Sequence, residues 1–389
     1  MSKLKQTPDY IAPETQEQAV PEKKAKKKKK QRSGALGRFI RRFFLVLFTL
    51  IFLIVGGLVM VLDLVFTGPS VEARNMLTMS LIEASAPKWV PALFIGEEAV
   101  AEIREKQGKE LPNDVANVDA IVINKDAMLT VTDEWKDHPD GIRIESYKGD
   151  TFNAHIMIIR DPSRVYCATS TDKFSLNTLG TRITNQIETE GAVAGINAGS
   201  FNDDGTGKAT NGSIPLGLVY SEGECLWTNG TPNERGYAGF TEDHVLVVAK
   251  DMTKAKAEEL GIRDMCGFGP VLIMDGEINE TAYNTISGLN PRTAIGQRKD
   301  GAVIFVCIDG RQTGSLGGEY ADIIDIMVEY GAYNACNMDG GSSAVMLYRD
   351  NLGLYGEAGK VQMINSYSLL QEEPRRMPTF WMVRPGSEE

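Results

Sequence analysis

Twenty consecutive uncharged and mostly apolar residues, from Phe43 to Leu62, divide this chain into two parts that are expected to lie in different surroundings. About 20 apolar residues in a helix are enough to cross the hydrocarbon core of a bilayer. The apolar run continues to Phe66 and shows no polar face, which argues against a buried core helix. It is longer than the core of a usual cleaved signal peptide, and no clear cleavage site follows it. The sequence therefore predicts a single transmembrane helix over residues 43–66.

The distribution of charge predicts the orientation of this helix. Residues 1–42 contain thirteen Lys or Arg against four Asp or Glu, a balance of +9, so the remaining 347 residues carry −20 of the total −11. Basic residues beside a membrane span favour the cytoplasmic side. We therefore predict a single-pass protein of the cell membrane, with a cytoplasmic N-terminus and an extracytoplasmic C-terminal domain. The lysine tract at residues 23–30 is interpreted as a topology signal, and no nucleic-acid-binding module accompanies it.

Composition divides the chain further. Residues 1–42 form a basic tail rich in Lys, Glu, Gln and Pro, which is typical of disorder. Residues 67–117 are predicted to form a stalk, with helices over residues 71–84 and 96–107 interrupted by prolines. From residue 118 to residue 389, short β-rich runs alternate with turns rich in Gly, Asn and Asp. Strands grouped with a few inserted helices, without regular alternation, favour an α+β fold with a mixed β-sheet over a doubly wound sheet.

Individual elements follow from local periodicity. Helices are predicted over residues 181–189, 253–260 and 319–330. Strands are predicted over residues 142–147, 155–159, 165–169, 192–196, 214–220, 245–249, 271–274, 302–308, 344–347 and 380–383.

Cysteine and histidine show no spacing typical of a metal site or a local catalytic triad. The five cysteines are an odd number without a Cys-x-x-Cys pair, so buried free thiols are favoured, and one disulfide remains open. No glycine-rich nucleotide-binding motif is present. We therefore predict no metal site and no cofactor, while a requirement for a divalent cation is left open. The five cysteines are Cys167, Cys225, Cys266, Cys307 and Cys336, and the three histidines are His138, His155 and His244.

The segment 334–347, read as N-A-C-N-M-D-G-G-S-S-A-V-M-L, is the most informative candidate site. It places the carboxylate of Asp339 beside two glycines and two serines, just before an apolar run. Small residues allow the main chain to approach a sugar or a phosphate closely. Main-chain N–H groups from Gly340 to Ser343 are therefore predicted to bind an oxygen atom of such a group.

Four glycine-punctuated blocks carry a resemblance to a known family. They are G-I-N-A-G-S-F-N-D-D-G-T-G (195–207), G-F-G-P-V-L-I-M-D-G (267–276), N-P-R-T-A-I-G-Q-R-K-D-G (290–301), and the tract from C-I-D-G-R (307–311) to N-M-D-G-G-S-S (337–343). Over residues 140–385 they resemble the phosphodiester glycosidase family, the group of N-acetylglucosamine-1-phosphodiester alpha-N-acetylglucosaminidase and of bacterial exopolysaccharide-related proteins. This resemblance implies a glycosidase that acts on sugar-1-phosphodiesters.

The resemblance also implies site residues. Asp339 and Asp309, with Arg292 and Arg311, match the family's blocks and are predicted to be catalytic. Ala198 stands where the family has the first glycine of an Asn-Gly-Gly turn, and Ser342 stands where a third glycine is commoner. The residues predicted to bind the substrate are Asn197, Gly199, Thr293, Asn337, Gly340, Gly341, Ser342, Ser343 and Arg376.

The chemistry of a glycosyl phosphodiester fits these residue types. The leaving phosphate is already a stable anion, and the planar fork of arginine can donate two hydrogen bonds to it. The sugar ring develops positive charge in the transition state, and a nearby carboxylate stabilises that charge or activates water. Asp309 and Asp339 are the predicted acid pair, because both stand at Asp-Gly steps where apolar runs or turns close.

The predicted function is therefore a membrane-anchored extracytoplasmic hydrolase that cleaves a glycosyl phosphodiester in a surface polysaccharide or envelope glycan. Two alternatives remain open at this point. One is a non-catalytic module that binds glycan or assists exopolysaccharide assembly. The other is an ordinary glycosidase without a phosphate requirement, which would cleave aryl glycosides equally well.

Overall fold

The computed structural model describes residues 34–82, 88–105, 111–124, 132–202, 211–228, 236–367 and 373–386. Most of the predicted cytoplasmic tail lies outside these residues. The chain divides into two units, Met1–Met60 and Val61–Glu389. Helix α1 (Ala35–Thr67) covers the predicted span and extends it toward the N-terminus. Among the described residues, only its segment Gly37–Thr67 is long and apolar enough to cross a membrane, and its most apolar stretch is fully exposed.

Two shorter helices follow in the region predicted to be a stalk. Helix α2 (Val71–Ile82) packs against α3 (Val90–Glu105) through a small apolar cluster that includes Met79 and Val100. Helix α3 begins at Val90, earlier than the predicted residue 96. Pro91 lies in its first turn, where a missing backbone N–H breaks no intrahelical bond. Gly96 adopts a φ of 82° and kinks the helix, which explains why the predicted helix starts there.

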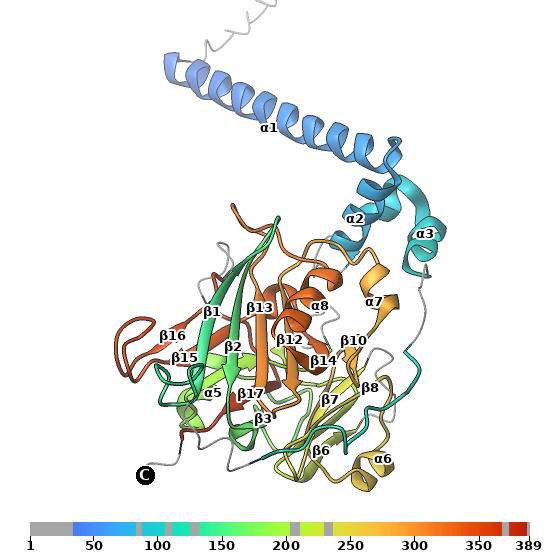
Figure 1. The fold of residues 1–389 in the computed structure, drawn as a ribbon. Helices are drawn as coiled ribbons and strands as arrows, with labels where there is room; N and C mark the ends of the chain where they lie inside the picture. Colours follow the sequence, from blue (N-terminus) through green and yellow to red (C-terminus); the bar gives the residue numbers. More distant parts are fainter. Residues whose placement is uncertain are drawn as a thin grey trace, which may run out of the picture. The chain divides into compact units, whose positions relative to one another are not determined.

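The remainder of the second unit is an α+β fold, so the predicted fold class is confirmed (Figure 1). The strands of the described residues form one seven-stranded and two five-stranded sheets, and every strand pair is antiparallel. The sheets are thus not mixed in strand direction. In the described parts of the chain, no strand is joined to a parallel neighbour by a crossover helix, which is the connection that parallel pairing requires.

The first sheet has the order β1 (Ile142–Lys148), β2 (Asn153–Ile159), β13 (Val303–Ile308), β12 (Arg292–Arg298), β14 (Ala332–Met338), β10 (Val271–Met274) and β11 (Glu277–Ile278). The second has the order β16 (Val361–Met363), β15 (Met346–Arg349), β4 (Ala194–Asn197), β17 (Thr379–Val383) and β3 (Val165–Thr169). The third has the order β6 (Glu224–Thr228), β5 (Leu218–Ser221), β9 (Ile262–Gly267), β7 (Tyr237–Thr241) and β8 (Leu246–Ala249).

Strand β13 shows how the core is organised. Its alternate residues Val303, Phe305 and Cys307 belong to the cluster shared by the three sheets, while Ile304, Val306 and Ile308 belong to the cluster under a helix. That helix is α8 (Tyr320–Glu329), which covers the outer face of the first sheet (Figure 1). Because both faces of β13 are buried, its sequence is a continuous apolar run without polar alternation.

Shorter helices cover the other sheets. Helix α5 (Ile183–Thr189) contributes to the cluster on the second sheet, and α6 (Lys254–Glu259) contributes to the cluster on the third. Helix α7 (Glu280–Asn284) follows β11. The three predicted helices of this region are therefore confirmed as α5, α6 and α8, with ends shifted by one or two residues.

Several strands were missed by the sequence analysis, including β12 and β14 at the centre of the first sheet. Both carry polar residues that are fully buried, such as Thr293, Gln297 and Asn334. The side chain of Gln297 accepts a hydrogen bond from the backbone of Leu246, and Asn334 donates one to the same residue. A polar residue can be buried when a distant strand supplies its hydrogen-bond partner. Such residues interrupt the apolar pattern from which strands are predicted, so these strands were missed.

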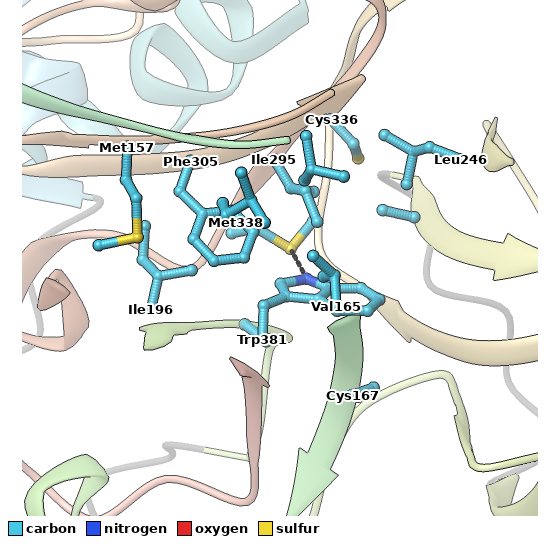
Figure 2. Close-up of a cluster of buried hydrophobic side chains, with 14 of the residues drawn as sticks. Met157, Val165, Cys167, Ile196, Leu246, Ile295, Phe305, Cys336, Met338 and Trp381 are labelled. Carbon is cyan, nitrogen blue, oxygen red and sulfur yellow. Dashed lines mark hydrogen bonds between the residues drawn. The ribbon is translucent and has the colours of Figure 1, made fainter. Parts of the chain in front are cut away.

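Sulfur atoms and a tryptophan fill the centre of the shared core. Met338 Sδ accepts a hydrogen bond from the indole Nε1 of Trp381 at 3.3 Å, and both side chains are fully buried (Figure 2). Cys266 lies 3.9 Å from the same sulfur atom. All five cysteines of the described residues are free, four of them buried, whereas Cys225 is partly exposed. Met338 also ends β14, so this core supports the residue that follows it, Asp339.

We expect Met338→Leu to lower the free energy of unfolding by about 1–3 kcal/mol more than Met157→Leu. Leucine fills a similar volume but leaves the buried Trp381 N–H without an acceptor, and an unsatisfied buried donor costs about 1–3 kcal/mol. Met157 is equally buried in the same cluster and serves as the matched control (Figure 2). Urea unfolding of the detergent-solubilised chain measures both variants. Equal destabilisation would show that the indole bond contributes nothing.

Candidate active site

The two predicted catalytic acids follow strands that end at the same edge of the first sheet. Asp309 comes directly after β13, and Asp339 comes directly after β14. Both strands pair antiparallel with β12, so Ile308 lies opposite Arg292 and Met338 lies opposite Thr293. Two strand spacings separate the acids, which places their backbones about 10 Å apart.

The backbone of Asp339 is fixed by three hydrogen bonds. Its N–H donates to the carbonyl of Ala198 at 3.0 Å, and its own carbonyl accepts from the Thr293 hydroxyl at 2.8 Å and from the Asn197 amide. Asn197 and Thr293 are fully buried, whereas Asp339 is half-buried. Two predicted substrate-binding residues therefore hold the acid from inside the protein, and the acid itself remains open to solvent.

Asp309 has the opposite environment, because its side chain is only 2% exposed. One carboxylate oxygen accepts the backbone N–H of Ser366 at 3.0 Å, and the other lies 3.4 Å from Nε2 of His155. The side chain of His155 is 17% exposed. Asp309 thus joins β2 to the segment after β16, and His155 is the more accessible member of the pair. His155 is not among the predicted site residues, because it stands alone in an apolar strand.

The turn after Asp339 brings a guanidinium group close to the main chain. Gly341 has a φ of 60°, and a β-carbon there would lie 3.2 Å from one terminal nitrogen of Arg311. A side chain at this position would therefore crowd the arginine. Arg311 is exposed, donates to the side chain of Asn290 at 2.8 Å, and has a φ of 57°. A non-glycine residue in the left-handed region is uncommon and is often found at functional sites.

A second arginine reaches the next residue of the same turn. Arg375 donates to the hydroxyl of Ser342 at 3.3 Å, and its guanidinium lies over the ring of Phe201 at 4.7 Å. Tyr367 donates to the carbonyl of Ser342 at 2.5 Å and accepts from the backbone of Arg375. Burial raises the pKa of Tyr367 more than neighbouring Arg375 lowers it, so its hydroxyl remains a donor.

The neighbouring Arg376, which the sequence analysis predicted to bind substrate, lies elsewhere. Its guanidinium donates to the carbonyl of Gly180 at 3.0 Å, away from the Ser342 turn. Successive residues of an extended segment point to opposite sides, so only one of the two arginines can face the turn. The structure places Arg375, the residue before the predicted Arg376, beside the turn that follows Asp339.

Arg292 is 4% exposed and occupies the interior. Its guanidinium donates to the carbonyls of Ser287, Gly288 and Gly318 at 2.7–2.9 Å and lies 4.2 Å over the ring of Tyr320. These contacts hold two loops together. The structure therefore gives Arg292 a supporting position and does not bring its guanidinium to the exposed side of the turn.

The other predicted binding residues also lie behind the turn. Asn337 is 1% exposed and its amide donates to Gly269, while the N–H of Gly199 donates to the Thr379 hydroxyl. Ser343 is 1% exposed. Ala198 is not among the described residues with a positive φ, so alanine fits this position of the turn without strain. The half-buried members of the predicted set are Asp339, Gly340, Gly341 and Ser342 in the turn, and Arg376 outside it.

Comparison with known proteins identifies the family. Residues 190–384 match the phosphodiester glycosidase family, and the chain belongs to this family. Its domain is therefore that of a hydrolase acting on phosphodiester-linked sugars, which confirms the resemblance found in the sequence. The match begins after β3, later than the predicted start at residue 140.

Individual relatives are more distant. The chain is 36% identical over 87 residues to the SPbeta prophage-derived uncharacterized protein YomE of Bacillus subtilis (strain 168), covering 22% of this chain and 14% of that protein. The zebrafish N-acetylglucosamine-1-phosphodiester alpha-N-acetylglucosaminidase catalytic domain, auto-inhibited by its pro-peptide, is 19% identical with a TM-score of 0.49, covering 63% of this chain and 82% of that chain. A hypothetical protein from Synechocystis is 16% identical with a TM-score of 0.40, covering 62% and 61%.

Proposed function

We propose that this chain is a membrane-anchored extracytoplasmic hydrolase that cleaves a glycosyl phosphodiester in a surface polysaccharide or envelope glycan. One observation carries the proposal beyond the family. The guanidinium groups of Arg311 and Arg375 lie beside consecutive residues of the turn that follows Asp339. Two cations beside the turn that follows one carboxylate suit a substrate that carries a phosphate anion and develops positive charge on its sugar.

The solvent exposure of each site side chain suggests its role in the reaction. Arg311 and Arg375 bind the phosphate, and the stable phosphate anion leaves without strong protonation. Half-buried Asp339 stabilises the positive charge of the sugar ring or takes a proton from the attacking water. Buried Asp309 is a positioning residue in this scheme, because it holds the Ser366 backbone and His155 rather than facing solvent.

The anchoring part of the proposal rests on α1 and on the charge imbalance across it. Thirteen basic residues precede Phe43, and the positive-inside tendency assigns that side to the cytoplasm. The catalytic unit then faces the exterior. A glycan-binding or exopolysaccharide-assembly module would keep the same anchor and the same arginine pair but would lack turnover.

The test of the activity uses the detergent-solubilised full chain and a panel of sugar-1-phosphodiesters. We expect released reducing sugar from at least one phosphodiester and much slower cleavage of the matching aryl glycoside. Binding without release would support the non-catalytic module. Equal rates on both substrates would instead support an ordinary glycosidase without a phosphate requirement.

Replacement of each of the two adjacent arginines separates their roles. We expect Arg375→Ala to reduce kcat/KM by about 10- to 100-fold, since a hydrogen bond to a charged group contributes about 1.5–3 kcal/mol. We expect Arg376→Ala to leave kcat/KM within about threefold and to lower stability by about 1 kcal/mol through the lost bond to Gly180. Steady-state kinetics and urea unfolding measure both effects. A larger kinetic loss in Arg376→Ala would restore the assignment made from the sequence.

A further inference from the structure

The helical hairpin formed by α2 and α3 carries apolar side chains on two sides. One side is packed, because Met79 and Ile82 of α2 contact Val100 of α3. The other side is exposed: Trp89, directly before α3, is 63% exposed, and Leu93 is 71% exposed. These two residues are four positions apart and therefore share one side of the helix start. Large apolar side chains grouped in this way indicate a contact with an apolar partner.

The position of this exposed side along the chain identifies the partner. Phe66, in the last turn of α1, is fully buried, and its ring stacks on Phe94 of α3 with the centroids 5.0 Å apart. Phe66 and Phe94 belong to the same unit, Val61–Glu389. The start of α3 is therefore held at the carboxyl end of the apolar helix, one residue away from Leu93.

The sequence indicates how deep Phe66 and the start of α3 lie relative to the bilayer. The uncharged run ends at Leu62, and Asp63 is the first charge after it. Phe66 lies three residues further, about 5 Å along the helix. A bilayer has a headgroup layer of roughly 5–7 Å on each side of its hydrocarbon core. Phe66 and its partner Phe94 thus fall within the layer in which tryptophan and amphipathic helices are enriched.

The charges on α3 agree with this depth. Gly96, with its φ of 82°, separates the apolar start of the helix from the exposed acids Glu97 and Glu98. We propose that the start of α3 lies in the membrane interface, with Trp89 and Leu93 inserted between the lipid headgroups and the upper acyl chains of the bilayer that α1 crosses. This inference rests on the proposed anchoring by α1. It gives the catalytic unit a second, reversible attachment to the membrane.

Tryptophan fluorescence tests this contact in the full chain. The chain has four tryptophans, of which Trp135 and Trp381 are buried and Trp227 is partly buried. The protein is reconstituted into phosphatidylcholine vesicles that contain lipids brominated near the headgroup. We expect bromine to quench part of the emission, and Trp89→Phe to abolish that part while sugar release remains unchanged. Leu93→Lys keeps the fluorophore and should reduce the quenching with a shift of emission to longer wavelength.

A matched control moves the fluorophore away from the hairpin. The double variant Trp89→Phe, Leu352→Trp places a tryptophan at a position that is 44% exposed after β15, and its emission should not be quenched. If the protein floats with the vesicles but Trp89 is not quenched, the interfacial contact is refuted and the anchor stands. If the protein does not float, the anchoring proposal fails and the contact fails with it.

Discussion

Replacement of Asp339 by asparagine should reduce kcat by about 10²- to 10⁴-fold, the range expected for a lost acid–base or charge-stabilising group. Asparagine has nearly the same shape but carries no charge, so it cannot stabilise the positive sugar ring or accept a proton from water. KM should change little, because the lost interaction is made in the transition state. Steady-state release of reducing sugar from a phosphodiester substrate measures both constants.

The fold should tolerate this change. The hydrogen bonds that fix residue 339 use its backbone, with Ala198, Asn197 and Thr293 as partners, and none of these bonds requires the carboxylate. The free energy of unfolding should stay within about 1 kcal/mol of the native value, because asparagine keeps these backbone bonds and nearly the same side-chain volume. Asp243→Asn, at an exposed turn between β7 and β8, is the matched control and should retain full activity. Full activity in Asp339→Asn would reject the catalytic assignment of this acid.

The contrast between Asp339 and Asp309 could not be predicted from the sequence. Both acids stand at Asp-Gly steps after strand-like segments, and local sequence treats them alike. Their difference arises from segments far along the chain. His155 and Asp309 are 154 residues apart in the sequence. They meet because β2 pairs with β13 in a register that places His155 opposite Cys307, two residues before Asp309. The backbone of Ser366 closes the other side.

The elements that could be predicted have their signals in neighbouring residues. The apolar run of β13 and the one-sided apolar pattern of α8 depend on burial of each element alone, so periodicity was sufficient. The elements that were missed depend on partners. Gln297 of β12 and Asn334 of β14 are polar, yet both are fully buried against Leu246 of β8. Sequence patterns report burial through hydrophobicity and therefore fail where buried groups are polar but paired.

The arginines of the candidate site show the same limit of prediction from sequence. The resemblance to the family led to the prediction of Arg292, Arg311 and Arg376 as site residues, because residue type and spacing are readable. Which guanidinium faces the turn depends on the carbonyl groups around each one. Arg292 is surrounded by the carbonyls of Ser287, Gly288 and Gly318, which come from two loops that no local pattern connects to it.

Replacement of Arg311 by glycine should change activity with a smaller effect on stability than other replacements of this residue. Arg311 has a φ of 57°, a conformation that costs roughly 1–2 kcal/mol for a residue with a β-carbon and little for glycine. Relief of this strain should offset the lost bond to Asn290 and the greater freedom of the unfolded chain. The free energy of unfolding should therefore stay within about 1 kcal/mol of the native value. Activity should nevertheless fall, because no cation remains beside Gly341 to bind the phosphate.

The size of that fall and its controls define the test. We expect kcat/KM for the phosphodiester to drop by about 10²- to 10³-fold, as when a preorganised donor to a developing anion is removed. Arg311→Lys should recover part of the loss, since a lysine keeps the charge without the two-pronged geometry. Glu222→Gly is the matched control, because Glu222 has a φ of 52° in an exposed turn between β5 and β6. It should change stability as little as Arg311→Gly does and leave kcat/KM unchanged. If Arg311→Gly kept its activity, the strained arginine would be a feature of the turn alone, and the phosphate would have to be bound elsewhere.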